Sequence, residues 1–503
     1  MTRLNAREMI NVLVDEGAWA SWDAALPDVG AVAEYADELE CARAKTGVDE
    51  SVLTGNASIR GHHVAIAVCE FGFLGGSIGV GAGDRLTTAI QRATAQRLPL
   101  LVLPTSGGTR MQEGTTAFLQ MVRITAAIAD HKAAGLPYLV YLRHPTTGGV
   151  FASWGSLGHL TFAEPEALIG FLGPRVYEAL HGRPFPADVQ TSENLYHHGL
   201  LDAVCRPDEL AGLVARTLDI VATPQRAPAV AFNSERVLDT VPAWVSVQAT
   251  RHLERPGVQS LLAAAATDVV PLHGTGQGEV DAGLILALAR FDDVSCVLVG
   301  QDRLAQVDSA IGPAALRQAR RGMRLAAELG MPLVSVIDTP GGALSEEAEE
   351  GGVAGEIARC IADMISLDVP TVSVLLGQGT GGAALALFPA DRTLGAAHGW
   401  LSPLPPEGAS AILHQNTRRA PEVADRQGIR AADLLASGAL DRIIPEYPDA
   451  RWEPEQFCSR VAAAIRHELA SLALLDPATR LRCRIGRFDR LATSAPSLAA
   501  ETA

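Results

Sequence analysis

The sequence predicts an α/β protein built from two similar domains in tandem. Five pairs of residues share one spacing of 233 positions, namely Pro99/Pro332, Gly108/Gly341, Pro137/Pro370, Thr147/Thr380 and Gly149/Gly382. Such a register is the signature of an internal duplication. In both copies, short buried apolar runs alternate with helical patterns, which favours parallel strands connected by helices. The length of 503 residues exceeds a single core and fits two domains of roughly 200–250 residues.

The sequence of the first copy predicts a strand, a helix, another strand and a glycine turn, in that order. Val64–Val68, Leu100–Leu103 and Tyr138–Leu142 are apolar runs of strand length, and Arg85–Arg97 has helical character between the first two. We predict a first domain over residues 1–225. Its N-terminal segment, Ala6–Ser21, has the pattern of an amphipathic helix.

The second copy repeats this order. Its predicted strands and helices are Ser295–Val299, Pro313–Leu329, Leu333–Ile337, Gly355–Leu367 and Val372–Leu376. We predict a second domain over residues 240–503, joined to the first by a linker rich in proline and polar residues around 222–228. The tail after Pro477 is expected to begin as a helix.

Composition excludes several classes of protein. The net charge of −16 argues against a general nucleic-acid binder, which needs a basic surface. Lys45 and Lys132 are the only lysines, so anionic ligands would be left to arginine or backbone amides. The seven cysteines are isolated in sequence, which encodes neither a zinc ribbon nor a disulfide framework. No signal peptide or membrane span is predicted, and we expect a cytoplasmic protein without a metal.

The glycine pairs at the ends of predicted strands are the candidate site. A Gly-Gly pair at a strand-to-helix turn exposes backbone N–H groups, where the helix dipole favours negative charge. Glycine also lets a ligand approach the backbone closely. Such amides can hold a phosphate or form an oxyanion hole for a thioester enolate. The alternative, tight turns without a ligand, does not by itself explain why four such turns occur at repeat-related places.

Three other patterns carry less weight. Gly75–Gly79 matches the nucleophile elbow of serine hydrolases, but the repeat has no place in that fold. Gly377, Gly379 and Gly382 match the dinucleotide fingerprint but lack its acidic residue about 20 positions on. The pairs His62/His63 and His197/His198 are more typical of surface or packing histidines than of metal ligands.

Several motifs resemble the carboxyltransferase of acetyl-CoA carboxylase. In the first half, four segments resemble its bacterial β subunit: Glu70–Gly79, Ser106–Gly114, His144–Val150 and Ala163–Phe171. In the second half, three segments are similar to its α subunit: Ile337–Gly341, Gly377–Ala386 and Ser402–Leu413. The order of the motifs looks closest to the fused acyl-CoA carboxylase β chains of actinobacteria.

The resemblance implies two tandem crotonase-like domains of the ββα-superhelix type. It also implies carboxyl transfer from carboxybiotin, carried on a partner protein with a biotin carboxylase, to acetyl-CoA or another short acyl-CoA, giving malonyl-CoA from acetyl-CoA. Two oxyanions then need stabilisation, which would explain two glycine sites. Family members place the active site at a dimer interface, so a homo-oligomer is implied.

Carried over by motif, the resemblance assigns site residues in both halves. Gly148 and Gly149 would supply amides to the thioester oxyanion in a pocket lined by Gly107 and Gly108. Gly382 and Ala383 would face the biotin carbonyl, near Gly341. Arg110 and Arg175 are candidates for the CoA phosphates, the alternative for each being an ion pair within the fold. Leu385 is a candidate for the wall of the acyl pocket.

The chain departs from the family pattern in two places. The four-cysteine zinc ribbon of the bacterial β subunit is absent from the sequence. The second-half motif also reads Pro-Gly-Gly-Ala-Leu-Ser over 340–345, where the α subunit usually carries an aromatic and a proline. Two other functions remain compatible with these motifs: a biotin-independent malonyl-thioester decarboxylase and a noncatalytic scaffold of a carboxylase complex.

Overall fold

A computed structural model describes residues 3–25, 33–222, 241–307 and 309–493 of the chain. Its contacts divide the chain into two compact units, the first Met1–Asp219 with Leu272–Glu279 and the second Ile220–Pro271 with Val280–Ala503. The short segment 272–279 belongs to the first unit because the His273 amide donates to Asp202 Oδ1 (3.1 Å) and the Gly276 amide to the Gly199 carbonyl (2.8 Å). The predicted domains, 1–225 and 240–503, stay a prediction, and most of the predicted linker lies outside the described residues.

The first unit contains a twisted mixed sheet with its glycine turns at one edge. Within the described residues the strand order is β1-β2-β3-β4-β5-β7-β9. The first three strands are antiparallel and the remaining pairs are parallel. Their bounds are β1 (Ala20–Ser21), β2 (Val52–Ile59), β3 (His62–Cys69), β4 (Leu100–Leu103), β5 (Tyr138–Leu142), β7 (Leu160–Ala163) and β9 (Ala203–Val204), with a separate pair β6 (Thr146–Thr147) and β8 (Ile169–Gly170).

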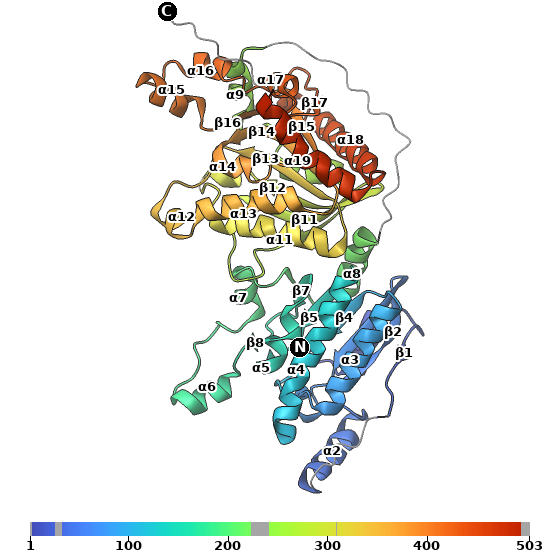
Figure 1. Cartoon of the computed structure of the whole chain (residues 1–503). Helices are drawn as coiled ribbons and strands as arrows, with labels where there is room; N and C mark the ends of the chain where they lie inside the picture. The colour runs from blue at the N-terminus through green and yellow to red at the C-terminus, as the bar shows by residue number, and fades with distance from the viewer. Residues whose placement is uncertain (1–2, 26–32, 223–240, 308, 494–503) are drawn as a thin grey trace, which may run out of the picture. The chain divides into compact units, whose positions relative to one another are not determined.

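Helices α3 and α4 lie side by side over one face of this sheet (Figure 1). Ile90 and Ile124 from these helices pack on Val102 and Val140 from the strands. The helices are α1 (Ala6–Leu13), α2 (Ala33–Thr46), α3 (Val80–Ala95), α4 (Gly114–Ala133), α5 (Gly148–Phe151), α6 (Pro174–His181), α7 (Ser192–His197) and α8 (Pro207–Val221), with short 3-10 turns at Leu74–Gly76, Met111–Glu113 and Trp154–Ser156.

The second unit repeats the sheet. Its main path is β10-β11-β12-β13-β14-β15-β17, and β16 also pairs with β14. As in the first unit, an antiparallel pair, β11 and β12, opens a run of parallel strands. The bounds are β10 (Asp268–Leu272), β11 (Leu284–Phe291), β12 (Val294–Gln301), β13 (Leu333–Thr339), β14 (Thr371–Thr380), β15 (Arg392–Ala396), β16 (Trp400–Ser402) and β17 (Arg442–Ile444).

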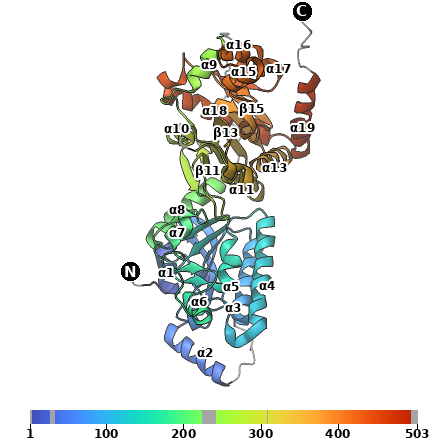
Figure 2. The same cartoon turned by 90° about the vertical axis from the view of Figure 1, so that its left-hand side faces the viewer.

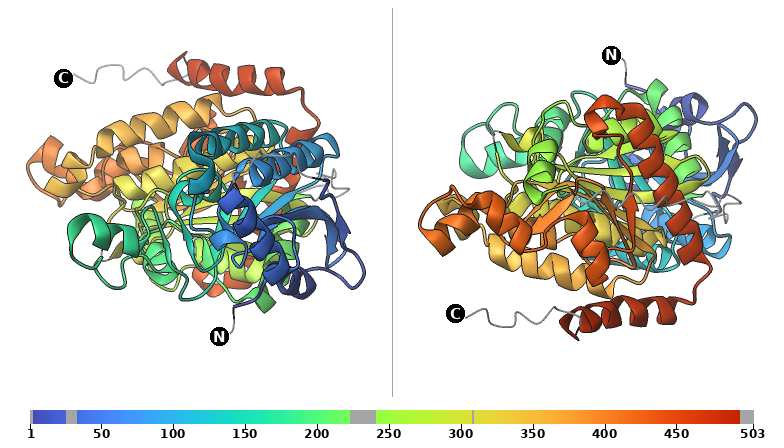
Figure 3. Two further views of the ribbon diagram at one scale, coloured as in Figure 1. Left: turned by 90° about the horizontal axis from the view of Figure 1, so that it is seen from below. Right: turned by 90° about the horizontal axis from the view of Figure 1, so that it is seen from above.

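Helices cover both faces of this second sheet. Helices α10 and α18 close the core on one face. On the other, Gly322 lets α11 approach the strands, because a methyl group there would lie 2.6 Å from Val299 Cγ2. The C-terminal helix α19 runs along the outside of this unit (Figures 2 and 3). The helices are α9 (Ala243–Thr250), α10 (Val258–Ala265), α11 (Pro313–Leu329), α12 (Glu346–Glu350), α13 (Val353–Ser366), α14 (Gly381–Leu385), α15 (Pro406–His414), α16 (Ala420–Arg426), α17 (Ala431–Ser437), α18 (Pro454–Ala473) and α19 (Pro477–Thr493), with 3-10 turns at Ala305–Val307 and Ala450–Trp452.

The duplication is therefore present in the topology as well as in the sequence. Strands β2 to β5 correspond to β11 to β14, and helices α3, α4 and α5 correspond to α11, α13 and α14. The turn that precedes β4 and β13 also repeats: the Leu98 amide donates to the Ala93 carbonyl, and the Met331 amide to the Ala326 carbonyl, both at 2.9 Å.

The N-terminal helix is shorter than its apolar pattern predicts. A capping box formed by Asn5 and Glu8 starts α1 at Ala6, but the helix ends at Leu13 rather than near Ser21. Asp15 instead accepts hydrogen bonds from the Arg60 and Gly61 amides in the β2–β3 turn, and Gly17 adopts a left-handed φ of +72°. Among the described residues, no helix combines the length and apolar character of a membrane span.

Candidate functional site

Four glycines of the first unit lie against one another at the carboxyl ends of β4 and β5. A methyl group on Gly108 (φ +113°) would be in van der Waals contact, at 3.4 Å, with both Gly148 Cα and Gly149 N. A methyl group on Gly148 would lie 3.2 Å from the Gly107 carbonyl oxygen. The structure thus brings together the four first-half glycines that the motifs single out.

Most amides of this cluster are already hydrogen-bonded. The Gly107 amide donates to the Gly75 carbonyl (2.9 Å), and the Gly108 amide to Ser106 Oγ (3.0 Å). The Gly148 amide donates to the Phe171 carbonyl (3.0 Å). Within the described part of the chain, only the Gly149 amide of these four has no protein acceptor, which follows from its place in the first turn of α5. Gly148 supplies the left-handed turn (φ +67°) that presents it.

Arg110 is a buried structural residue of this loop. Its guanidinium pairs with the carboxylate of Glu50, contacts Glu113 at 3.3 Å and donates to the Ser77 carbonyl at 2.8 Å. Burial disfavours its charge, yet the Glu50 carboxylate raises the pKa of Arg110 above its usual range. The geometry thus matches the ion pair within the fold, the alternative that the sequence left open. Arg175 lies in α6, and its side chain is outside the described part of the structure.

The second unit presents the repeat-related glycines after β13 and β14. Gly341 (φ +137°) donates its amide to Thr339 Oγ1 (3.1 Å), as Gly108 does to Ser106. The Thr339 hydroxyl in turn donates to Gln306 Oε1 (2.6 Å). Gly382 and Ala383 lie in the first turn of α14, where amides have no carbonyl from a preceding turn. The Ala383 carbonyl accepts a bond from Gln301 Nε2 (2.8 Å), which holds this turn in place.

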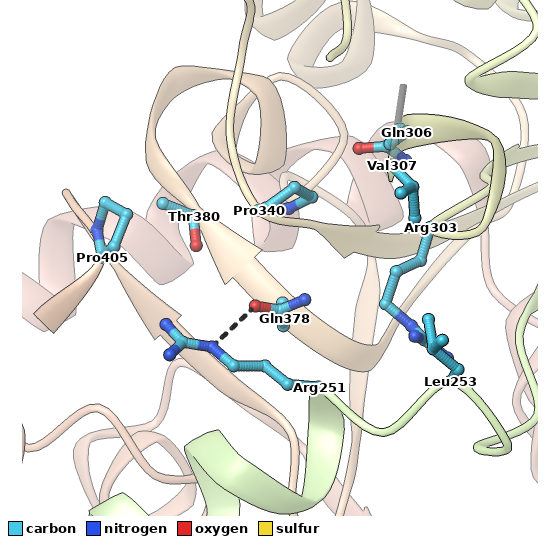
Figure 4. A pocket seen from close by; sticks show the side chains of 9 residues that line it. All are labelled: Arg251, Leu253, Arg303, Gln306, Val307, Pro340, Gln378, Thr380 and Pro405. Carbon is cyan, nitrogen blue, oxygen red and sulfur yellow. Dashed lines mark hydrogen bonds between the residues drawn. The ribbon is translucent and has the colours of Figure 1, made fainter. Parts of the chain in front are cut away.

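A cavity of about 300 Å³ opens beside these turns in the second unit. Figure 4 shows the side chains that line it, which come from the ends of β13 and β14 and from the segments around 251, 303 and 405. They are Arg251, Leu253, Arg303, Gln306, Val307, Pro340, Gln378, Thr380 and Pro405. Leu385, at the end of α14, is not among them, and its side chain is 46% exposed.

The two arginines of the cavity are both paired with carboxylates. Arg251 binds both oxygens of Glu407 (2.6 and 3.1 Å), and these bonds lower the pKa of Glu407. Arg303 Nε lies 3.2 Å from Asp338 Oδ2, at the end of β13. Burial raises the pKa of Asp338, while the charge of Arg303 acts against that rise. The charge of each arginine in the cavity is therefore balanced by a carboxylate.

The competing sequence patterns have structural explanations. Ser77 of the elbow-like motif donates to the Leu74 carbonyl (2.8 Å), within its own turn. Gly377 of the dinucleotide-like motif has no room for a side chain, because a methyl group there would lie 2.4 Å from Asp338 Oδ1. Among the described residues no group of histidine, cysteine and acidic side chains could hold a metal ion.

Sequence reasoning missed the polar lining of the cavity. Arg251, Arg303 and Gln306 stand outside the glycine motifs, and they reach the cavity only because the segments that carry them fold next to β14. Gln378 and Thr380 stand inside the motif Gly377–Gly382, where alternation along β14 was the available signal for side chains on one face.

The comparisons with known proteins agree on one family. The family model described as carboxyl transferase domain matches residues 1–481. A probable biotin-dependent acyl-coenzyme A carboxylase beta3 subunit of Mycobacterium tuberculosis is 56% identical over 98% of this chain and 99% of its own length. The acetyl-coenzyme A carboxylase carboxyl transferase subunits beta/alpha of Salinispora arenicola are 36% identical over 98% of this chain and 91% of that protein.

Solved structures share the fold at low identity. The transcarboxylase 12S, crystallised as a hexamer assembly with methylmalonyl-coenzyme A, has a TM-score of 0.73 at 20% identity and covers 94% of this chain and 91% of its own. A single-chain, multi-domain long-chain acyl-CoA carboxylase has a TM-score of 0.72 over 92% of this chain and 46% of its own. The predicted α/β, two-domain, crotonase-like fold class is confirmed.

Proposed function

Because this chain belongs to the carboxyl transferase family of biotin-dependent acyl-CoA carboxylases, we propose that it transfers a carboxyl group from biotin to acetyl-CoA or another short acyl-CoA. The observation that supports this most is the pair of repeat-related glycine turns at the ends of buried strands, each with a first-turn backbone amide that has no acceptor among the residues the structure describes. Such amides suit developing oxyanions.

The first unit is the proposed thioester site. The Gly149 amide donates to the thioester oxygen when negative charge develops there, and Gly107 and Gly108 leave the space through which that oxygen approaches. Gly148 holds the turn through its bond to Phe171. An oxyanion donor of this kind contributes on the order of 10²–10³ in rate.

The second unit is the proposed biotin site. When bound as carboxybiotin, biotin supplies the carboxyl group. The residues present fit a planar ring with a carbonyl oxygen: Gly341 and Gly342 leave open a cradle, since a methyl group added at either position would find its nearest neighbour 3.7 Å away. The amides of Gly382 and Ala383 form the adjacent donor pair at the start of α14.

Leu385 is the residue that we propose tunes the acyl chain. It follows the Gly382–Ala383 turn and is half exposed, so it is available to a ligand or to a second chain. A change of one methylene at such a wall is worth about 1–3 kcal/mol in selection. Leu385→Ala is therefore expected to raise the activity ratio of a longer acyl-CoA over acetyl-CoA by about 10-fold or more.

The proposed partners are a biotinylated carrier with its biotin carboxylase, and further copies of this chain. Helix α4 of the first unit presents an exposed apolar row: Met111 just before it (82% exposed), then Phe118 (59%) and Val122 (67%). Large apolar side chains exposed together mark interaction surfaces. This row suits a homo-oligomer in which one chain's first unit faces another chain's second unit.

The test is the reverse reaction with the purified full-length chain. Malonyl-CoA is supplied with and without biocytin, and acetyl-CoA and CO2 are followed. We expect acetyl-CoA only in the presence of biocytin. Release of CO2 without biocytin would assign a decarboxylase instead. Absence of turnover with malonyl-CoA and with longer carboxyacyl-CoA thioesters, even after addition of the biotinylated partner, would assign a scaffold.

A further inference from the structure

We propose that Thr380, Gln378 and Arg303 form an oxygen-binding subsite in the second unit that receives the ureido ring of biotin, in addition to the glycine amides. The inference rests on the proposed function, which it extends from the backbone to three side chains. It rests on the cavity of about 300 Å³ and on hydrogen-bonding groups in its lining, one of which, the Thr380 hydroxyl, has no partner among the described residues.

The Thr380 hydroxyl is the first of these groups. The residue is 2% exposed, and its Oγ1 has no hydrogen-bond partner among the described residues. Its repeat counterpart, Thr147, donates to the Ser106 carbonyl (3.4 Å). Figure 4 shows the Thr380 hydroxyl turned into the cavity, toward Gln378 and Arg251. A buried hydroxyl without a partner costs free energy, so a ligand oxygen at this place would satisfy it.

The Gln378 side chain is oriented by Arg251. Arg251 Nε donates to Gln378 Oε1 (3.4 Å), and a guanidinium has no acceptor, so the oxygen of the amide must face it. The Nε2 group of Gln378 is left pointing into the cavity (Figure 4). Arg251 is itself held by both oxygens of Glu407. The side chain of Gln378 is thus a fixed hydrogen-bond donor toward the ligand space.

Arg303 supplies a third donor. Its Nε donates to Asp338 and its Nη2 to the Arg255 carbonyl (2.9 Å), which anchor the guanidinium at 5% exposure. Its Nη1 has no acceptor within the described part of the chain. Three potential donors therefore line one cavity, and two of them are held in place by the protein: Gln378 by Arg251, and Arg303 by Asp338.

The chemistry of this set selects a particular class of ligand. The hydrogen-bond donors would bind carbonyl or carboxylate oxygens of a ligand. The apolar side chains of Leu253, Val307 and Pro340 would pack against a compact ring in the same cavity. The phosphates of CoA do not match, because Asp338 and Glu407 already neutralise both arginines. A neutral or singly charged ring with oxygen substituents, such as the ureido ring of biotin, matches both features.

The experiment compares variants that change one donor each in the full-length chain. Thr380→Val removes the hydroxyl with little change of shape, Thr380→Ser keeps it, and Gln378→Glu replaces the donor Nε2 by an oxygen. Thr267→Val, an exposed threonine before β10, is the matched control. Biocytin affinity is measured by saturation-transfer NMR titration, and the KM values for biocytin and for malonyl-CoA are measured in the reverse reaction.

We expect Thr380→Val to weaken biocytin binding by about 10-fold, the usual worth of a buried hydrogen bond to a ligand. Gln378→Glu should weaken it at least as much, while Thr380→Ser and Thr267→Val stay near the wild type. The KM for malonyl-CoA should not change in any of them. Unchanged biocytin affinity in both Thr380→Val and Gln378→Glu would overturn the subsite and leave the proposed function intact.

Two further outcomes would also overturn the subsite. A rise confined to the KM for malonyl-CoA would assign the cavity to the thioester. A wild-type chain that neither binds biocytin nor needs it to release CO2 would overturn the proposed function and this inference together. Melting temperatures of the variants separate these outcomes from a failure to fold.

Discussion

The two copies of the glycine site have the same backbone turn but differ in the side chains that stabilise it. In both, a hydroxyl two residues before the left-handed glycine accepts that glycine's amide: Ser106 for Gly108, Thr339 for Gly341. In the first copy Arg110 anchors the next residues to Glu50, whereas the repeat-related residue of the second copy is Ala343. The second copy instead fixes Thr339 through Gln306. The two copies therefore have the same turn but different side chains that support it.

The supports differ in their consequences for ligands. The first copy uses its polar groups within the protein, with the Thr147 hydroxyl and the Gly148 amide both bonded to carbonyls. The second copy leaves Thr380 Oγ1 without a partner among the described residues, and a cavity opens beside it. If both turns bind ligands as proposed, the first offers mainly backbone groups, whereas the second offers side chains as well.

The largest expected effect is on the support of the first copy. Arg110→Met leaves the buried Glu50 carboxylate without its partner, so we expect a loss of about 3–5 kcal/mol in the free energy of unfolding. Urea denaturation followed by circular dichroism measures it. The double variant Arg110→Met/Glu50→Gln should recover part of the loss. A stable Arg110→Met protein with a raised KM for acyl-CoA would instead assign Arg110 to the CoA phosphates.

The next effect separates the two glycines. Alanine strains the backbone at both positions, since φ is +113° at Gly108 and +137° at Gly341. At Gly108 the methyl group also lies 3.4 Å from Gly149 N and covers that donor, whereas at Gly341 its nearest neighbour is Thr380 Cγ2 at 3.7 Å. We expect kcat to fall by about 10²–10³-fold for Gly108→Ala and by about 10-fold for Gly341→Ala. Equal losses would contradict this difference between the copies.

A buried histidine adds a pH effect to the first copy that its repeat-related position in the second copy lacks. His131 is buried between Thr94 Oγ1 (2.9 Å) and the Pro137 carbonyl (3.2 Å), and burial lowers its pKa to about 4. The unfolded chain, with an ordinary histidine pKa, takes up a proton first as the pH falls. The stability present above pH 6.5 is therefore lost between 6.5 and 4, by about 2 kcal/mol at pH 5.

The second copy provides the matched variant for this test. Its repeat-related residues are the apolar pair Ala327 and Met364. We expect the double variant Thr94→Ala/His131→Met to lose about 2 kcal/mol less than the wild type between pH 7 and pH 5. Denaturant unfolding at both pH values measures the difference. An identical loss in both proteins would show that His131 does not carry this pH dependence.

The smallest effect concerns the turn after the first long helix of each copy. Arg97 adopts a left-handed φ of +52° where the second copy has Gly330 at +63°. Arg97→Gly removes the strain but adds freedom to the unfolded chain, so we expect a net gain of about 0.5–1 kcal/mol. The reciprocal Gly330→Arg should lose a similar amount. Thermal unfolding measures the stability of both variants. A lower stability of Arg97→Gly than of the wild type would show that the arginine side chain makes contacts that compensate for the strain.

The regular elements were predictable because their signals are local. The apolar run Tyr138–Leu142 is a strand with those bounds, and Pro313–Leu329 is a helix with those bounds, begun by a proline and ended by Gly330. The N-terminal helix was overestimated because its apolar pattern continues past Leu13. There a tertiary contact, Asp15 to the β2–β3 turn, decides the backbone.

The sequence by itself determined the duplication, the strand and helix order, and the glycine turns at repeat-related positions. Spacing and residue type are sufficient for these, since a left-handed turn or a buried strand is specified by neighbours in the chain. Only the tertiary structure decided which amides stay available, as the Phe171 carbonyl takes that of Gly148. It alone gathered Arg251, Arg303, Gln306 and Thr380 around one cavity. Contacts between residues so far apart in the chain leave no local pattern, because they depend on how the strands pair.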